Sequence, residues 1–500
     1  MILAIYDLSG IQKFIFSTNK LKEIIGASAV VNNALFKKVP EMCGDTNNTW
    51  REKKFFFSSD DKKKIVYIGG GNALLMFDTE STYSAFTREL TEKVFLQSGG
   101  AIRIFSACVE LDETKNLSEN QKKLMDKLDL AKKSGGSTLP SLCLPITAYD
   151  NNNFEPLVIR EVNGKERYAS ASKFAKLIGV SASNDIFKDI IFSDKISFAT
   201  KFDKSRKTET KNYVSIIHID GNTMGIMIRN FVQSLDGVNI FTALDEMRKL
   251  SVKIGELYKN VLKLTVKDIY DGTEGEILFR PVVADGDDIT VILESTKAFE
   301  FTEKFMGYLK ESKLNLNSDK VFSPTAAAGI AFVGLKFPFS TAYDIAEQCC
   351  KNAKKETLKR TDGNAKSSMD FQVCYSNIAG TVSEYRKDNY TVNNATLIRR
   401  PYIFDDIIPY SYAEFKEMCD EINLGIKNRM IARSKLKGLR NEYGVSVLNA
   451  NNYGKYIHAH ADKEERIISK KLSVPFNSKN EAIFFDYLDV MDIAWKGEEG

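Results

Sequence analysis

The spacing of apolar residues divides most of the chain into two similar segments, and each begins with a short β-prone run. The first run, at 1–7, is followed by helical spacing from about Ile11 and again after Ala27-Ser28. Apolar side chains that recur every three or four residues are typical of an amphipathic helix, whereas runs rich in β-branched and aromatic residues are typical of strands. The first segment therefore starts as a strand and two helices.

A glycine-rich turn is the next feature of this segment. Gly69-Gly70-Gly71-Asn72 lies between two apolar runs, which predicts a hairpin. The other elements predicted here are extended runs at 54–58, 65–68 and 73–77, a helix at about 81–97 and a strand at 101–109. The order strand, helices, two strands, helix, strand predicts an antiparallel, ferredoxin-like sheet with its helices on one face.

The second segment repeats this order of elements. It predicts a strand at 213–219, helices at about 223–233 and 239–263, a hairpin at 277–293, a helix at 296–312, a strand at about 325–333, a helix at about 340–358 and a last strand at 369–374. Asp7 and Gly71 are 64 residues apart, and Asp220 and Asp287 are 67 residues apart. Similar spacing in matching order indicates that one unit was duplicated.

Two regions lie outside the repeat. Residues 111–200 are more polar, with a charged helix at about 117–133, and a charged linker follows at 201–211. After about 380 the spacing is helical, as at 411–423 and 426–440. We therefore expect an α+β protein with a ferredoxin-like domain, a connecting or insertion domain, a second ferredoxin-like domain and a helical C-terminal domain. Their expected bounds are 1–110, 111–210, 211–380 and 381–500.

Length and composition agree with several soluble domains. At about 100–200 residues per domain, 500 residues predict three or four domains. The net charge of +4 gives no general basic field for nucleic acid, so such contacts need a local patch. No apolar run approaches 18 residues, and the start of the chain lacks a basic leader. We expect a cytoplasmic protein with no membrane span.

The cysteines and histidines do not indicate a metal site. No two cysteines form a CxxC pair, so we expect free, mostly buried thiols rather than structural zinc. The seven are Cys43, Cys108, Cys143, Cys349, Cys350, Cys374 and Cys419. His218 lies inside an apolar strand, where a packed role is favoured over catalysis. His458 and His460 alternate, but no third ligand lies near them in the sequence.

Aspartates at the end of one strand and in one hairpin carry the candidate chemistry. Asp220 ends the strand 213–219, and the hairpin that follows turns at Asp285-Gly286-Asp287-Asp288. Carboxylates suit Mg²⁺ or Mn²⁺, and paired ions can drive phosphoryl or nucleotidyl transfer. The first segment keeps Asp7 but has glycines and asparagine at its turn, so we expect only the second to hold metal. An ordinary acidic turn is the alternative, because Asp-Gly is a favoured hairpin dipeptide.

Several motifs in the same order resemble the large polymerase-like subunit of type III CRISPR effector complexes. They lie at 7–16, 25–28, 69–73, 220–225, 285–288, 326–330, 353–354 and 368–371, so the resemblance covers about 1–375. The resemblance implies two ferredoxin-like palm domains, of which the first is degenerate. It also implies ATP as substrate, Mg²⁺ or Mn²⁺ as cofactor, and synthesis of cyclic oligoadenylate signals in antiviral defence.

The resemblance also implies roles for individual residues. Asp220, Asp287 and Asp288 are the expected catalytic residues and metal ligands. Lys354 is expected to meet phosphate. The residues expected beside the nucleotide are Gly221, Asn222, Gly225, Asp285 and Gly286.

The chain departs from the family pattern in several places. Asn222 stands where a second acid is usual, and Asp285 replaces the first glycine of a hairpin that usually reads GGDD. Zinc-binding cysteines are missing between the palms, where only Cys143 lies. No room precedes Asp7 for a nuclease domain, so we expect no DNA cleavage by that route.

The resemblance leaves alternatives open. It implies other CRISPR effector subunits and guide or target RNA as partners, with a homodimer through the palms as a further arrangement. A free-standing relative that works outside such a complex is equally open. So are a nucleotide sensor without turnover and a catalytically silent scaffold that binds nucleotide or RNA. For the basic helix at 427–440, a solvated face is favoured over a phosphate-contacting surface.

Overall fold

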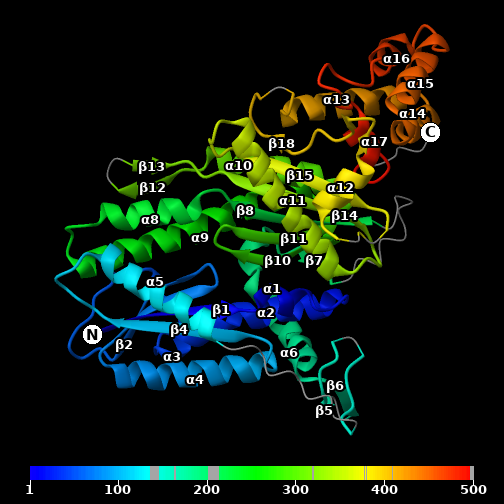
Figure 1. The fold of residues 1–500 in the computed structure, drawn as a ribbon. Coiled ribbons are helices and arrows are strands. Elements are labelled where there is room, and N and C mark those ends of the chain that lie inside the picture. The colour runs from blue at the N-terminus through cyan, green and yellow to red at the C-terminus, as the bar shows by residue number, and fades with distance from the viewer. Residues whose placement is uncertain are drawn as a thin grey trace.

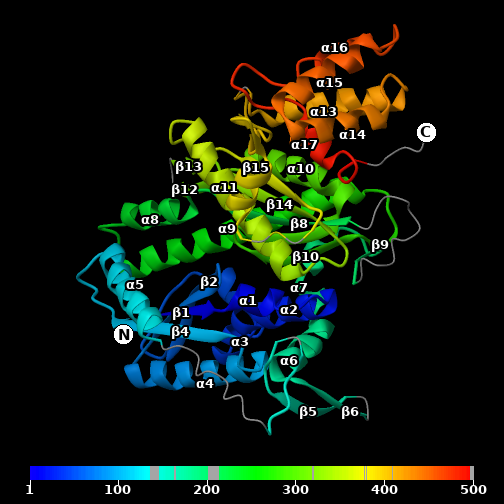
Figure 2. The same ribbon diagram turned by 45° about the vertical axis from the view of Figure 1, so that its right-hand side comes forward.

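The computed structural model describes residues 1–495 except 136–145, 152, 163–164, 201–212, 318–319, 377, 379 and 408. Figure 1 shows three layers along the molecule: the first palm in blue and cyan, the second in green and yellow, and the C-terminal helices in orange and red. The same order is visible after the turn in Figure 2.

The first palm is a four-stranded sheet in the order β2-β3-β1-β4, with every neighbouring pair antiparallel. The bounds are β1 Ile2–Ser9, β2 Lys63–Gly69, β3 Asn72–Phe77 and β4 Arg103–Glu110. This confirms the ferredoxin-like sheet expected from the sequence. The run at 54–58 joins no strand, although Phe55 and Phe57 are buried.

Helices cover both faces of this sheet, so the expectation of helices on one face only was incomplete. The helices α2 (Leu21–Phe36) and α4 (Glu80–Ser98) pack on the face that carries Ala4 and Tyr6. The helix α5 (Leu117–Ser134) packs on the opposite face, against Leu3 and Ile5. Successive side chains of a strand point to opposite faces, and here both sets are buried.

The second palm repeats the arrangement in a six-stranded sheet, in the order β10-β11-β8-β14-β15-β18. The strands are β8 Tyr213–Gly221, β10 Phe279–Asp285, β11 Asp288–Glu294, β14 Ala326–Gly334, β15 Ser368–Cys374 and β18 Tyr402–Ile403. The helices are α8 Met224–Ser234, α9 Ile240–Tyr270, α10 Ala298–Glu311 and α11 Phe339–Arg360. The helix α11 crosses over from β14 to β15, which therefore pair in parallel.

The strand register supports the duplication inferred from spacing. In the first palm, Asp7 lies opposite Asn72. In the second, Ile219 lies opposite Ile289, so Asp220 and Asp288 are the next pair along the two strands. The turn 69–72 therefore corresponds to the turn 285–288.

The two palms pack through reciprocal contacts. Helix α2 of the first palm contacts β10 of the second, and helix α9 of the second contacts β2 of the first (Figures 1 and 2). Ser28 donates a hydrogen bond to the carbonyl of Val282, and Arg248 Nε donates to the carbonyl of Val66 at 3.0 Å. Both carbonyls lie where the strand register shifts. Each bulge thus supplies an acceptor to a helix of the other palm.

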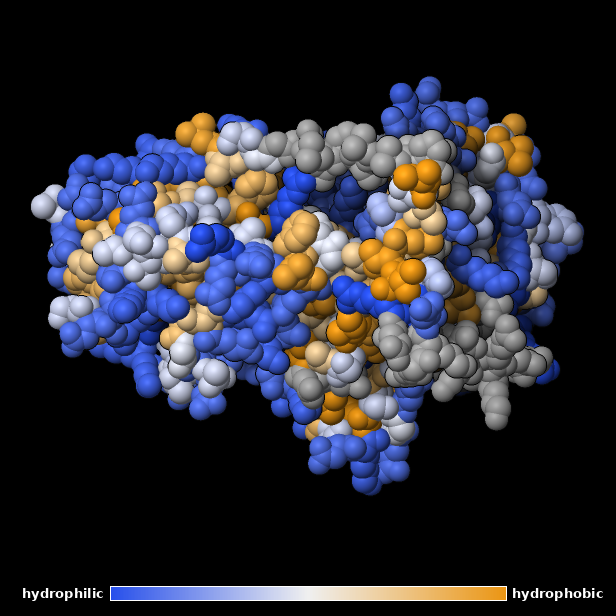
Figure 3. Space-filling model, turned by 90° about the horizontal axis from the view of Figure 1, so that it is seen from below, coloured by the Kyte–Doolittle hydropathy of each residue, from blue (hydrophilic) through white to orange (hydrophobic). Residues whose placement is uncertain are grey.

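The described part of the connecting region packs on the first palm through glycine. Helix α6 (Ala171–Gly179) crosses α2 so closely that a Cβ on Gly26 would lie 1.7 Å from the carbonyl oxygen of Lys176. A side chain there would displace one of the helices. In Figure 3, a view from below, exposed apolar side chains gather between hydrophilic ones. Exposed examples on the elements at this end are Phe95, Leu96, Ile159, Tyr168 and Ile178.

The C-terminal region is helical, as expected, but one predicted helix is divided. Helix α13 ends at Lys427, and α14 begins at Arg433, because Arg429 adopts a left-handed backbone with φ of 58°. The helices are α12 Val382–Asn389, α13 Tyr412–Lys427, α14 Arg433–Val445, α15 Val447–Ala459, α16 Arg466–Leu472 and α17 Phe485–Val490. None of the helices described in residues 1–495 has the length and apolar character needed to cross a bilayer.

Buried ion pairs join this region to the second palm. Arg400 lies two residues before β18 of the second sheet and is fully buried. It lies 2.9 Å from Asp486 and 3.3 Å from Asp489 of α17. Arg386 of α12 pairs with Asp370 of β15 at 2.7 Å. Buried charges need such partners, so these contacts fix α17 and α12 against the sheet that carries the candidate site.

The basic residues of 427–440 mostly pair with acids. Arg433 and Lys437 both contact Asp492, Lys435 contacts Glu465, and Arg440 contacts Asp489. These pairs favour a structural role for this face over a phosphate-contacting one.

Candidate active site

Asp220 lies at the C-terminal end of β8, next to Lys354 of α11. The Nζ of Lys354 is 2.7 Å from Asp220 Oδ2 and donates a hydrogen bond to the carbonyl of Gly221 at 2.8 Å. The ammonium thus bridges a carboxylate and the next backbone carbonyl. The Asp220 side chain is 43% exposed, so its carboxylate remains open to solvent and ligands.

Gly221 explains why the strand end and the hairpin meet. A Cβ on Gly221 would lie 2.7 Å from Asp287 Oδ2 and 2.8 Å from Asp287 Cβ. Only glycine permits the Asp287 side chain to lie against this backbone. The structure therefore brings together Asp220, Gly221, Asp287 and Lys354 from three elements of the fold.

The electrostatics of the hairpin carboxylates reflect their crowding. Burial raises the pKa of Asp287 to about 6, with repulsion from Asp220 adding to the effect. Burial also raises the pKa of Asp288 to about 8, with further repulsion from Asp220, Asp285 and Asp287. Carboxylates crowded in this way are stabilised when they bind a cation or a proton.

Asp288 and His218 lie side by side on the face covered by α11. Asp288 Oδ1 is 3.5 Å from His218 Nδ1, which also lies 3.1 Å from the Thr290 hydroxyl. The imidazole packs edge-on against Tyr343, with ring centroids 5.5 Å apart. Burial lowers the pKa of His218 and so favours its neutral form. This position fits the packed role expected for His218.

Asp285 turns away from the other hairpin carboxylates and toward the first palm. Its Oδ1 accepts a hydrogen bond from the amide of Gly70 at 3.1 Å, and its Oδ2 accepts one from Gly71 at 2.9 Å. Burial raises the pKa of Asp285, and these two hydrogen bonds oppose the rise. Both carboxylate oxygens are therefore engaged by the first palm.

Asn222 and Gly225 shape the turn after β8. The amide of Asn222 donates to the Thr325 hydroxyl and to the carbonyl of Lys366, both at 3.1 Å. The next residue, Thr223, has a left-handed φ of 58°. Asn222 thus holds the turn, where the family pattern has an acid. Gly225 lies in the first turn of α8, and a Cβ there would meet nothing within 4 Å.

A cavity of about 550 Å³ lies along the seam between the palms. Its walls include Gly286 and Asp287 of the second palm and Gly70 and Asn72 of the first. Ligand sites usually have volumes of about 300–1,000 Å³, so a nucleotide-sized ligand fits this range. A second cavity of about 220 Å³, on the α1 and α2 side (α1, Ile11–Phe16), falls below it.

Sequence reasoning missed several polar and aromatic residues that line the larger cavity. They are Trp50, Arg51, Ser251, Lys259 and Lys263. In the sequence, lysines 259 and 263 look like part of a solvated helix face, and nothing marks Arg51. The guanidinium of Arg51 lies 5.5 Å from the Trp50 ring and 5.7 Å from the Phe36 ring, which holds a cation in the cavity wall.

The residues fit a divalent cation that is shared with a substrate. Within the described residues, no three His, Cys, Asp or Glu side chains are arranged to enclose a metal ion. His458 and His460 are therefore not part of such a group either. Mg²⁺, however, is usually held by one or two carboxylates together with substrate phosphates. Asp220 and Asp287 supply such a pair, because Asp287 lies against Gly221, the residue after Asp220, and the two charges repel each other.

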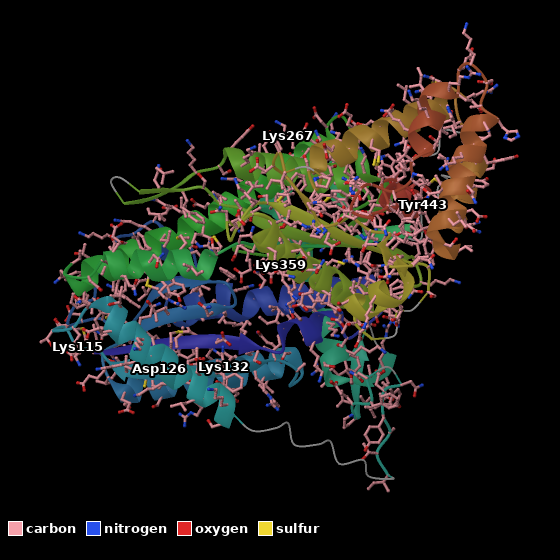
Figure 4. All side chains as sticks on the ribbon, turned by 45° about the horizontal axis from the view of Figure 1, so that its top comes forward. Lys115, Asp126, Lys132, Lys267, Lys359 and Tyr443 are labelled. Atoms are coloured by element: carbon pink, nitrogen blue, oxygen red, sulfur yellow. The ribbon has the colours of Figure 1, made fainter. Side chains whose placement is uncertain are left out.

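The corresponding position in the first palm is neutralised within the protein. Lys132 of α5, labelled in Figure 4, lies 2.9 Å from Asp7 Oδ2. Its place on the helix after the sheet matches that of Lys354. Gly71 and Asn72 stand where the second palm has Asp287 and Asp288. One carboxylate faces one lysine here, and no excess negative charge remains to attract a divalent ion.

The comparison with protein families now bears on this site. Residues 213–362 match the family described as Cas10/Cmr2, second palm domain. This stretch is similar to a Cas10/Cmr2 second palm. The match includes β8, both hairpin strands and the whole of α11, and so contains Asp220, Asp287 and Lys354. The resemblance to the large subunit of type III CRISPR effectors is thus confirmed for the second palm.

Solved structures extend the likeness to the whole fold. The crystal structure of apo Csm1-Csm4 cassette matches with a TM-score of 0.54 and 13% identity, over 99% of this chain and 70% of that chain. The same cassette in complex with cA4 and in complex with one ATP each match with a TM-score of 0.53 and 12% identity, over the same shares. At these identities the likeness establishes the two-palm fold. No curated protein matches the chain.

The six cysteines that the structure describes are free thiols, as expected. Cys143 lies outside the described residues.

Proposed function

We propose that the second palm is a metal-dependent nucleotidyltransferase that joins ATP into cyclic oligoadenylate signals. The observation that carries this proposal is the packing of Asp287, which lines the 550 Å³ cavity, against Gly221, the residue after Asp220. The match of residues 213–362 to the Cas10/Cmr2 second palm domain supports it. So do similar folds that were crystallised with ATP and cA4.

In this proposal, Asp220 and Asp287 would hold Mg²⁺ or Mn²⁺ together with the triphosphate of ATP. An ion bound there would supply charge neutralisation and activation of the attacking hydroxyl. The 3′-oxygen of a second nucleotide attacks the α-phosphate, the new P–O bond forms, and pyrophosphate leaves with the electron pair of the broken bond. The chain itself contributes position and fixed charge, and no protein nucleophile is needed.

In this proposal, Lys354 has two alternative partners, the Asp220 carboxylate and the phosphates of ATP. Without a nucleotide its ammonium neutralises Asp220. With ATP bound, the same ammonium would be placed to contact the phosphates. Asp288, beside neutral His218, is the candidate for a third ligand of the same ion.

In this proposal, the first palm helps to bind the nucleotide but holds no metal ion. Its Asp7–Lys132 pair is balanced, and its turn contributes glycine amides and Asn72 to the cavity wall. The reaction proposed here therefore has one metal centre per chain, in the second palm.

A test begins with the purified chain, ATP and Mn²⁺, and mass spectrometry of the products. We expect oligoadenylate and pyrophosphate, with or without added target RNA. The Asp287→Asn variant is expected to yield far less of both products, whereas a variant of an exposed aspartate at the end of α9, Asp271→Asn, keeps wild-type output. Absence of product in every condition, with nucleotide binding intact, would support a nucleotide sensor or scaffold instead.

The partners follow from the same relatives. The similar structures contain Csm1 together with Csm4. We propose that this chain also assembles with CRISPR effector subunits and RNA in the cytoplasm. Co-purification from cells that express the neighbouring genes tests this, and a chain that remains monomeric would favour a free-standing enzyme.

A further inference from the structure

The residue that departs most from the GGDD pattern makes the most direct contact between the palms. Asp285 stands where the first glycine is usual, and its carboxylate bridges the amides of Gly70 and Gly71, 215 and 214 residues away in sequence. We infer that Asp285 is a positioning residue that fastens the catalytic hairpin to the turn of the first palm.

The geometry of the two turns supports this inference. Gly70 and Gly71 have φ values of 62° and 74°, in the left-handed region where only glycine is unstrained. In this conformation their amides point toward one carboxylate. Hydrogen bonds to a charged acceptor are stronger than those between neutral groups, so the contact resists separation.

Two basic residues lie in the same cavity wall as this contact. They are Lys259 of α9 and Arg51, which line the 550 Å³ cavity together with Asp285. The carbonyl of Val282, in the same strand, accepts a hydrogen bond from Ser28. The strand β10 is thus held to the first palm at two positions, of which the Asp285 contact is the one next to the catalytic turn.

The contact has no counterpart in the other direction. The first palm has Gly69 at the position of Asp285, and a Cβ there would already lie 3.3 Å from the Ser251 hydroxyl. The second palm therefore supplies the acceptor carboxylate across the seam, and the first palm supplies the donor amides. Since both turns line the 550 Å³ cavity, the contact sets the distance between its two walls.

This assignment distinguishes Asp285 from its neighbours in the hairpin. Both of its oxygens are engaged by backbone amides, whereas Asp287 lies against Gly221 beside Asp220. Asp285 is expected to organise the cavity without binding the ion. The effect on turnover rests on the proposed function, but the contact itself does not.

The experiment uses three variants of the full chain. Asp285→Gly restores the usual residue and removes the carboxylate. Asp285→Asn keeps one acceptor oxygen. Asp271→Asn serves as the exposed control. Hydrogen–deuterium exchange is followed at the turn 69–72 without nucleotide, and Mn²⁺ binding and binding of a non-hydrolysable ATP analogue are measured separately.

We expect exchange at the turn 69–72 to be fastest in Asp285→Gly and intermediate in Asp285→Asn, with the control unchanged. Affinity for the ATP analogue should fall about tenfold in Asp285→Gly, as loss of a charged hydrogen-bond acceptor implies. Mn²⁺ affinity should stay within about twofold of the wild type, well below the tenfold step that corresponds to one lost ligand interaction.

Two results would overturn the inference. Unchanged exchange at the turn 69–72 in Asp285→Gly would mean that the contact does not hold the turn. Loss of Mn²⁺ binding equal to that of Asp287→Asn would make Asp285 a metal ligand. If the wild type makes no product but the exchange result holds, the contact stands and the proposed function fails.

Discussion

Charge balance at single residues separates the two palms. In the first, Asp7 and Lys132 neutralise one another. In the second, Lys354 contacts Asp220, and Asp287 and Asp288 add two further carboxylates. Their raised pKa values show that burial and mutual repulsion disfavour the charged forms. A site with more carboxylates than local cations is one that a divalent ion stabilises.

Substitution of Asp287 tests this balance most directly. Asp287→Asn should reduce nucleotidyl transfer by about 10²–10³-fold, the range that loss of one key electrostatic group usually costs. The rate of pyrophosphate release measures it. The variant should unfold at the same temperature as the wild type or higher at pH 8, because a crowded charge is removed. A large drop in unfolding temperature would contradict this reading.

Cation binding should weaken as the pH falls. Because the pKa of Asp287 is raised to about 6 in the metal-free protein, protons compete with the cation below that pH. Apparent Mn²⁺ affinity should fall about tenfold per pH unit between pH 6 and pH 5, since one proton must leave for each ion that binds. Titration calorimetry at pH 8, 7, 6 and 5 measures it. A flat profile would remove Asp287 from the ligand set.

The same shift predicts how stability depends on pH. A carboxyl group whose pKa is raised on folding binds more protons in the folded state. Its contribution therefore favours folding most at low pH and is lost as the pH rises through about 6. In metal-free protein, the stability gained by Asp287→Asn over the wild type should be larger at pH 8 than at pH 4. Thermal unfolding at both pH values tests the sign.

Lys354 should act in opposite directions with and without nucleotide. Its ammonium occupies Asp220 and the Gly221 carbonyl, where it competes with an incoming cation. Lys354→Met should therefore raise Mn²⁺ affinity of the free protein about threefold to tenfold, consistent with removal of a nearby like charge, yet reduce ATP turnover. Manganese binding followed by electron paramagnetic resonance separates the two effects. A fall in both quantities would instead mean that Lys354 has a purely structural role.

At the scale of helices and strands, most of the fold follows from periodicity. The strands of both palms and most long helices lie close to their expected bounds, because each buries a regular stripe of apolar side chains. One exception is α2, which begins at Leu21 rather than after Ala27-Ser28, because Leu21, Ile24 and Ile25 are also buried. The run at 54–58 misled this approach. Phe55 and Phe57 are buried by tertiary contact, and the amide of Phe55 bonds to Asp245 rather than to a neighbouring strand.

Two further differences between the predicted and the observed fold have causes that the spacing of apolar residues does not show. The predicted helix at 426–440 is divided where Arg429 turns left-handed. Helix α5 covers a sheet face that was expected to be free, which its own amphipathic pattern did not reveal. The strand-end and hairpin aspartates were found by sequence, whereas the turn of Asp285 toward Gly70 depends on how two distant domains pack.

Glycine 329 sets the distance between a helix and a strand. A Cβ there would lie 1.9 Å from the carbonyl oxygen of Ala346, so α11 packs directly on the backbone of β14. Gly329→Ala should destabilise the protein by about 1–3 kcal/mol, the usual cost of overpacking. Gly307→Ala on α10 is the matched control, because its Cβ would meet nothing within 4 Å and helix propensity favours alanine. Urea unfolding measures both, and equal effects would refute the close approach.

For the whole molecule, buried ion pairs join the C-terminal helices to the second palm. Removal of Arg400 leaves Asp486 and Asp489 without their main partner, so Arg400→Met should cost about 3–5 kcal/mol. Lys416→Met breaks an exposed pair with Glu303 and should cost no more than about 1 kcal/mol. Chemical denaturation of both variants compares them. A small loss for Arg400→Met would mean that the C-terminal helices fold independently.

The reciprocal packing of the palms has a consequence for their ancestry. In each palm a helix contacts the bulged strand of the other palm: α2 contacts β10, and α9 contacts β2. Identical subunits contact each other in this reciprocal way across a twofold axis. A single ancestral domain that paired with itself would have had this seam before the gene was doubled. Joined in one polypeptide, one copy could then lose its acidic residues while its surface continued to complete the other.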